Sequence, residues 1–277
     1  MNDRATHIFD TASVLRNRGR SRKLGSDFDF LRAEVADRLQ DRVQDVNRPF
    51  ENILDVGGDM MRFTGRGTGG AGTIDISDEP LDVVQGHYDL IVSNLVMHWV
   101  NDLPGLLIQL NRALKPDGLL LAAMLGGETL RELRHALLSA EVEITGGANA
   151  RVAPFADVKN LGSLLQRAGL ALPVTDTDTI TVTYDHPLKL MQELRGMGEA
   201  NALKSRSKSF LRRDVIMRAC EIYQEEYAFT NGRVPATFQI MYLTGWHPHE
   251  SQQKPMKPGS AKMSLADALK HSSPKKG

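Results

Sequence analysis

The spacing of apolar residues divides the chain into alternating helices and strands. Residues 26–45 predict a helix, because their apolar side chains recur at three- and four-residue steps and share one face: Phe28, Leu31, Val35, Leu39 and Val43. Residues 52–56 and 119–124 predict short strands, and 88–94 is apolar enough to predict a strand buried on both faces. Between them, 103–114 predicts a helix with a leucine stripe, which Pro116 ends. This order indicates an α/β fold with a parallel sheet and a crossover helix.

The second half of the chain predicts more helix and fewer strands. Helices are expected over 128–142 and 157–168, and alternation over 179–184 predicts an outer strand. Residues 186–229 read as mostly helical, interrupted at 196–201, and 236–243 predicts the last strand. We therefore expect one domain over residues 26–246, with a helical insertion at 185–233, between a basic segment at 1–25 and an extended basic tail at 247–277.

Charge is balanced overall but unevenly distributed along the chain. The formal net charge is zero, so we do not expect a nucleic-acid-binding protein. Residues 16–23 (RNRGRSRK) nevertheless hold five cations and no acid, and the tail is rich in lysine. We interpret both basic ends as solvated, mobile termini. Docking to an acidic protein or to a membrane surface is the alternative.

Cysteine content and hydropathy favour a cytoplasmic protein. Cys220 is the only cysteine, which suits a reducing compartment. The longest apolar run, 119–125, is much too short to span a bilayer, and the N-terminus has no apolar signal core. We therefore expect a cytoplasmic location, with at most peripheral membrane contact.

The end of the 52–56 strand is the first candidate binding site. Asp55 is followed by Gly57 and Gly58, and glycines after a strand let a ligand approach the backbone at the carboxyl edge of a sheet. The carboxylate of Asp55 can accept hydrogen bonds from a ligand's hydroxyl or amino groups. A tight turn without a ligand has the same pattern, so this signal is weak by itself.

Asp75 is the second candidate and has two interpretations. It lies 20 residues after Asp55, which suits an acid at the end of a second strand that binds a ribose. Only 12 residues separate Asp75 from Tyr88, which is too short for a helix, a strand and two turns. We prefer the second interpretation, in which a helix–strand–helix section is missing and residues 75–81 belong to the edge of the third strand.

Histidines give one catalytic candidate and no metal site. His98 and Trp99 follow the 88–94 strand and should lie at the carboxyl edge, where ligands bind in such sheets. A packed core aromatic is the more ordinary explanation for Trp99. His247, His249 and Glu250 lie in the tail without a further well-placed ligand, so no metal is expected.

Several segments together resemble a known family. They are YDLIVSNLVMHWVNDLPGLL at 88–107, LKPDGLLLAAMLGGETLREL at 114–133, LMQELRGMGEANAL at 190–203 and VPATFQIMYLTGWHPHESQQKP at 234–255. With these the chain resembles, over nearly its whole length, the alphaproteobacterial and mitochondrial methyltransferase-like family that includes an arginine hydroxylase acting in respiratory complex I assembly. It is more distantly similar to the malonyl-carrier-protein methyltransferases of biotin synthesis.

The resemblance implies a Rossmann-like class I S-adenosylmethionine (SAM) methyltransferase sheet, shortened, with a final antiparallel strand. It places Asp55, Gly57 and Gly58 on the family's SAM loop, although Asp59 and Met61 stand where further glycines would be. It implies a protein client, such as a complex I subunit. Two functions stay open: an enzyme that methylates or hydroxylates a protein side chain, and a non-catalytic assembly factor. We expect the tail segment HPHESQQKP to pack across the mouth of the pocket or against a partner.

Overall fold

Six strands form one mixed sheet in the computed structural model, which describes residues 7–58, 71–76, 80–155 and 158–253. Their spatial order is β2 (Ala71–Ile74), β1 (Ile53–Val56), β3 (Tyr88–Asn94), β4 (Leu114–Leu125), β6 (Val234–Trp246) and β5 (Ala171–Tyr184). The first four run parallel, and β6 pairs antiparallel with both β4 and β5. This is the shortened α/β sheet expected from the sequence, with the helical insertion before its last strand.

The pairing of β2 corrects the preferred interpretation of Asp75. β2 lies directly beside β1, with Ile53 opposite Ala71 and Val56 opposite Ile74. In doubly wound sheets the second strand occupies that place, and the third lies outside it. Asp75 therefore follows the second strand, and the third-strand interpretation is wrong. Within the described residues, the strand missing from the sheet is the third.

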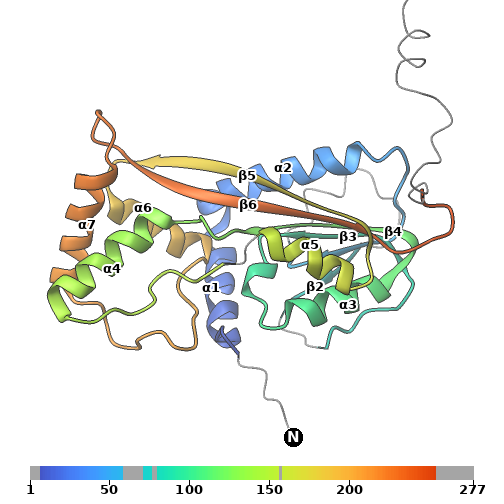
Figure 1. Cartoon of the computed structure of the whole chain (residues 1–277), viewed down its shortest axis with the longest axis horizontal. Helices are drawn as coiled ribbons and strands as arrows, with labels where there is room; N and C mark the ends of the chain where they lie inside the picture. Colours follow the sequence, from blue (N-terminus) through green and yellow to red (C-terminus); the bar gives the residue numbers. More distant parts are fainter. Residues whose placement is uncertain (1–6, 59–70, 77–79, 156–157, 254–277) are drawn as a thin grey trace, which may run out of the picture.

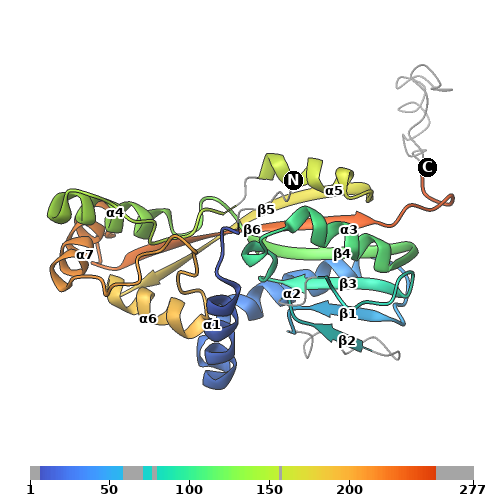
Figure 2. The same cartoon turned by 90° about the horizontal axis from the view of Figure 1, so that it is seen from below.

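Two hydrophobic cores lie on opposite faces of the sheet. Helix α2 (Phe30–Gln44) covers one face, and helices α3 (Leu103–Ala113) and α5 (Val158–Arg167) cover the other (Figure 2). Leu90 and Val92 face the first core, whereas Ile91 between them faces the second. Because the middle of β3 is buried on both faces, residues 90–92 are apolar without interruption rather than alternating.

Strands β5 and β6 extend well past the parallel part of the sheet and support a helical region (Figure 1). Helices α4 (Arg131–Thr145), α6 (Pro187–Met197) and α7 (Arg213–Tyr227) gather around this extension, and α4 packs along α7. Tyr223 of α7 is completely buried and donates a hydrogen bond to the Pro235 carbonyl oxygen at 2.7 Å. The insertion is thereby anchored to β6.

The basic stretch at 16–23 is ordered, so its interpretation as a mobile terminus is wrong. It forms most of helix α1 (Thr11–Leu24), which the short helix η1 (Gly25–Phe28) joins to α2. The Asp10 carboxylate caps α1 by accepting a hydrogen bond from the Ser13 amide at 3.1 Å. Helix α1 lies between the sheet and the insertion, beside α6 (Figure 2).

The described part of the tail packs at the amino end of β4. The His247 amide donates to the Gly118 carbonyl oxygen at 2.8 Å, and Gln252 donates to Asp117 at 2.9 Å. Parallel strands bind ligands at the opposite, carboxyl edge. The expectation that the tail crosses the pocket mouth is therefore wrong for residues 247–253, and 254–277 lie outside the described residues. None of the described helices is both long and apolar enough to cross a membrane.

Candidate functional site

The carboxyl edge of β1 and β2 brings together four of the predicted site residues. Asp55 is buried in β1, Gly57 and Gly58 follow this strand, and Asp75 follows β2. Gly57 has φ +119°, and a Cβ there would lie 2.5 Å from Cγ2 of Val96. Only glycine fits this backbone path without strain, so the turn requires the residue that the sequence provides.

Two arginines of α1 bind the same edge. The Nη2 atoms of Arg18 and Arg22 donate to the Gly57 carbonyl oxygen at 2.6 and 3.2 Å. Arg22 also lies 3.5 Å from a carboxylate oxygen of Asp75. Neither residue was predicted from the sequence. Their four-residue spacing places them on one helix face, and the Asp10 cap was the available signal that a helix begins there.

A cavity of about 220 Å³ opens between α1 and the strand ends that follow β2 and β3. Its apolar lining comes from three segments: Val14 and Leu15 of α1, Ile76 after β2, and Trp99 and Val100 after β3. Polar side chains complete the lining: His7, Thr11 and Asn101. Next to Ile76 in the chain, the second carboxylate oxygen of Asp75 is buried and has no hydrogen-bond partner among the described residues. A mixed cavity close to an acceptor that lacks a donor suits a flat ring joined to a hydroxyl-bearing group. These residues fit the nucleoside half of SAM.

A buried carboxylate, Glu199, joins the insertion to the carboxyl edge. It follows α6, and its Oε2 accepts hydrogen bonds from Nε1 of Trp99 at 2.9 Å and from Nε2 of His98 at 3.1 Å. Arg32 of α2 lies 3.9 Å from its other oxygen. Burial alone would raise the pKa of Glu199, but His98, Arg32 and Trp99 stabilise the charged form and hold the pKa below its ordinary value. The MGEANAL segment carries the family resemblance, but the role of Glu199 within it was not predicted from the sequence.

His98 lies in the short helix η3 (Met97–Trp99), at the edge where the sequence placed it. Its Nε2 lies 3.1 Å from Oε2 of Glu199, and a carboxylate favours the tautomer that donates from this nitrogen. The other nitrogen, Nδ1, is buried and has no hydrogen-bond partner among the residues that the structure describes. Glu199 therefore fixes the orientation of His98 at the carboxyl edge, which makes His98 a candidate general base for a substrate that reaches Nδ1.

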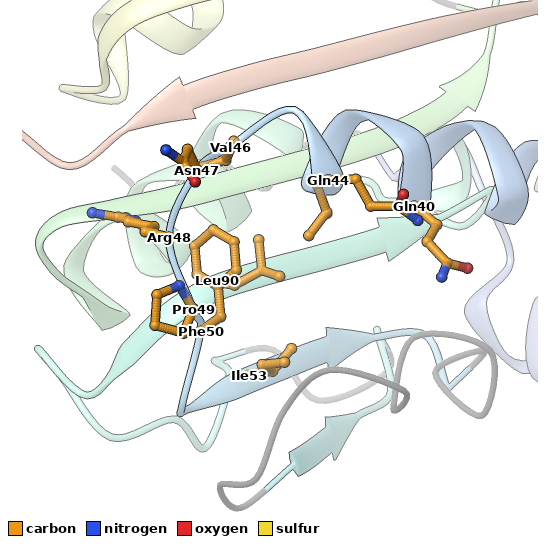
Figure 3. Close-up of a pocket in the computed structure, with 10 residues that line it drawn as sticks. Gln40, Gln44, Val46, Asn47, Arg48, Pro49, Phe50, Ile53 and Leu90 are labelled. Atoms are coloured by element: carbon orange, nitrogen blue, oxygen red, sulfur yellow. The ribbon is translucent and has the colours of Figure 1, made fainter.

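Two further cavities lie in other parts of the structure. One of about 170 Å³ adjoins Glu199 and is lined by apolar side chains of α4 and α6, with Arg151 and Arg195 at its border. Another, of about 440 Å³, lies between the end of α2 and the start of β1, where Phe50, Ile53 and Leu90 form its apolar wall (Figure 3). Because Ile53 begins β1, this larger cavity lies away from the carboxyl edge.

Known proteins that are similar to this chain support the fold described above and show which family the chain belongs to. A methyltransferase-domain family model matches residues 28–173. The arginine-hydroxylase NDUFAF5 of Danio rerio is 40% identical to 95% of the chain, a match that covers 90% of that protein. The Homo sapiens protein of the same name is 40% identical over 87% of the chain and 76% of its own length.

More distant relatives belong to the same broad group. A malonyl-[acyl-carrier protein] O-methyltransferase of Halorhodospira halophila is 30% identical over 89% of the chain and 91% of its own length. Among solved structures, the YcgJ protein of Bacillus subtilis superposes with a TM-score of 0.51 at 11% identity, covering 76% of this chain and 98% of that one. The last match supports the fold alone. The chain belongs to the methyltransferase-domain family, together with the NDUFAF5 arginine-hydroxylases.

Proposed function

We propose that this chain modifies an arginine side chain of a protein client by hydroxylation, during assembly of respiratory complex I, with SAM bound at the carboxyl edge. In this reaction one atom of dioxygen enters the side chain, and an external two-electron reductant reduces the other atom to water. The observation that carries the proposal is the 40% identity to an arginine hydroxylase over 95% of the chain. That match extends well beyond the generic methyltransferase region at 28–173, so it includes most of the insertion as well. The single, buried cysteine suits the cytoplasm as the place of this activity.

Each part of the site has a separate task in this proposal. Asp75 accepts a hydrogen bond from the ribose, and the cavity at Ile76 holds the adenine ring. Asp55 provides negative charge at the end of β1, and when bound SAM supplies a positively charged sulfonium centre. His98, oriented by Glu199, is the proton acceptor for the client guanidinium in this proposal.

A non-catalytic assembly factor is the second candidate function. It is favoured by Arg18 and Arg22, which already bind the Gly57 carbonyl oxygen at the edge where a ligand would approach. Asp59 also stands where related proteins have a motif glycine. In this alternative the fold holds a client without modifying it.

Mass spectrometry of complex I subunits separates these candidates. Subunits are isolated from cells with the gene intact, from cells in which it is deleted, and from deleted cells that express an Asp55→Asn variant. An arginine that carries one extra oxygen atom only when the intact gene is present supports hydroxylation. An extra methylene group would instead mean arginine methylation. Subunits of unchanged mass whose assembly still requires the gene would contradict the proposal and favour the non-catalytic factor.

A further inference from the structure

The fold brings together two basic segments that lie far apart in the sequence. Residues 16–23 contain five cations and no acid. Residues 204–213 (KSRSKSFLRR), between α6 and α7, also contain five cations and no acid. The whole chain has no net charge, so the rest of the chain is net negative, and this juxtaposition gathers positive charge in one part of the protein.

Several contacts fix the two segments to each other. The Lys204 amide donates to the Ile8 carbonyl oxygen at 2.8 Å, and Phe9 forms an isolated β-bridge with Leu203. Arg206 pairs with Asp10 at 2.9 Å. These contacts tie the start of α1 to the start of the second segment, so the two basic segments lie side by side where Arg206 meets Asp10.

Some of the ten cations serve the fold, and the others face solvent. Arg18 and Arg22 contact the carboxyl edge, and Arg206 and Arg212 pair with acids. Arg20 donates a hydrogen bond to the Arg195 carbonyl oxygen. Five side chains are exposed and form no ion pair with any residue that the structure describes; we call them the basic face: Arg16, Lys23, Lys204, Lys208 and Arg213. Phe210, between Lys208 and Arg213, is fully exposed. An exposed aromatic ring among cations is typical of a protein interface.

The basic face adjoins the candidate site. Arg22 belongs to the same helix as Arg16 and Lys23, and its half-exposed side chain reaches Asp75 at the carboxyl edge. A client arginine that approaches this edge therefore passes a surface of its own charge. Repulsion between like charges acts over about 8 to 10 Å at physiological salt, so an isolated arginine side chain would be disfavoured here.

We propose that the basic face binds an acidic surface of the client, so that the arginine to be modified is one with aspartate or glutamate around it. This inference rests on the proposed function and specifies its substrate class. Acidic side chains that flank the target arginine form ion pairs with the basic face, while the arginine side chain reaches the carboxyl edge. Charge complementarity thus selects among the many arginines of a client.

Fluorescence anisotropy with synthetic peptides tests the proposal on the full-length chain. The probe is a labelled peptide with a central arginine flanked by aspartates, and its comparison peptide has asparagines in their place. The test variant Lys23→Glu/Lys208→Glu changes one cation in each basic segment. The control variant Arg112→Glu/Arg167→Glu makes the same change of charge at exposed positions of α3 and α5. Circular dichroism verifies that both variants fold.

The aspartate peptide should bind the wild-type chain, more weakly as salt rises, and the asparagine peptide should not. Reversing two exposed cations should weaken binding about tenfold, since each exposed ion pair contributes roughly 0.2 to 1 kcal/mol and reversal adds repulsion. The control variant should bind like wild type. Equal binding of both peptides, equal loss in both variants, or binding to anionic phospholipid vesicles without peptide binding would overturn the proposal.

The mass-spectrometric experiment separates this inference from the proposed function. If the test variant loses peptide binding but modifies the client arginine in cells as wild type does, the basic face does not select the substrate and the proposed function stands. If the peptides behave as expected but no client arginine is modified in wild-type cells, the proposed function fails while the acidic-partner surface stands.

Discussion

Replacing Glu199 by glutamine removes one negative charge from the junction between the insertion and the sheet. The side chain is only 7% exposed and accepts hydrogen bonds from His98 and Trp99. Glutamine keeps the shape and one acceptor oxygen, but its amide nitrogen is a donor and cannot accept a hydrogen bond. The substitution also leaves the Arg32 guanidinium, 3.9 Å away, without this opposite charge.

The expected loss of folding free energy is about 3 kcal/mol. A hydrogen bond to a charged group contributes roughly 1.5 to 3 kcal/mol against about 0.5 to 1.5 for a neutral one, so two bonds lose about 2 kcal/mol. The weakened attraction to Arg32 adds about 1 kcal/mol, which keeps the total near the lower end of the roughly 3 to 5 kcal/mol for breaking a buried ion pair. Because the folded pKa of Glu199 is lowered, this stabilisation is present above its ordinary pKa of 4.5 and disappears as pH falls through the folded value.

Urea unfolding at pH 7, followed by tryptophan fluorescence, measures this loss. Trp99 contacts the substituted side chain, so its emission also reports the local change. Glu128→Gln is the control, because its side chain is 61% exposed in its pair with Arg131 and exposed pairs contribute little. A Glu199→Gln variant within about 0.5 kcal/mol of wild type would refute the reasoning, since that is the range of an ordinary surface substitution.

Three other substitutions have clear expected outcomes. Gly57→Ala should destabilise the fold by about 2 to 4 kcal/mol, from its positive φ and the clash with Val96. Gly19→Ala, in the middle of α1 where no atom crowds a new Cβ, should instead stabilise the fold by about 0.5 to 1 kcal/mol. Thermal unfolding that does not rank Gly19→Ala above wild type and Gly57→Ala below it would contradict the local geometry. A hydrogen bond from Arg151 lowers the pKa of Glu141 to about 2, so Glu141→Gln should cost about 2 to 3 kcal/mol at pH 7. That deficit should shrink as pH falls from 4.5 towards 2, and urea titrations in which it persists at the acid end would argue against the pair.

The central part of the fold was predictable because its signals are local. Leu31, Val35 and Leu39 predicted the buried face of α2, and all three are fully buried. The continuous apolar run of β3 predicted a strand with a core on each face, which the structure has. Such patterns need only near neighbours in sequence, so one chain is enough to recognise them.

The length of β5 was not predictable, because distant residues decide it. Asp176 and Asp178 interrupt the apolar alternation, so only 179–184 was expected to be a strand. In the structure these acids pair with Arg42 and Arg38 of α2. Their charge is compensated across more than a hundred residues of sequence, and the strand begins at Ala171.

Only part of the candidate site was predictable, again because distant residues decide the rest. Asp55 lies near the end of a strand, and Gly57 and His98 follow strands; that position alone placed them at the carboxyl edge. Arg18 lies in a polar helix without an apolar stripe, and its burial depends on the Gly57 carbonyl oxygen. Glu199 is buried only because His98 and Trp99 donate to it, which no spacing rule reveals.

Titration calorimetry of the purified chain with SAM, at two temperatures, tests the carboxyl-edge site most directly. We predict saturable binding to one site. Asp55→Ala should weaken that binding by at least about tenfold, because a buried hydrogen bond to a charged group is worth roughly 1.5 to 3 kcal/mol. No binding at either temperature, or an unchanged affinity in Asp55→Ala, would contradict a cofactor site at the carboxyl ends of β1 and β2.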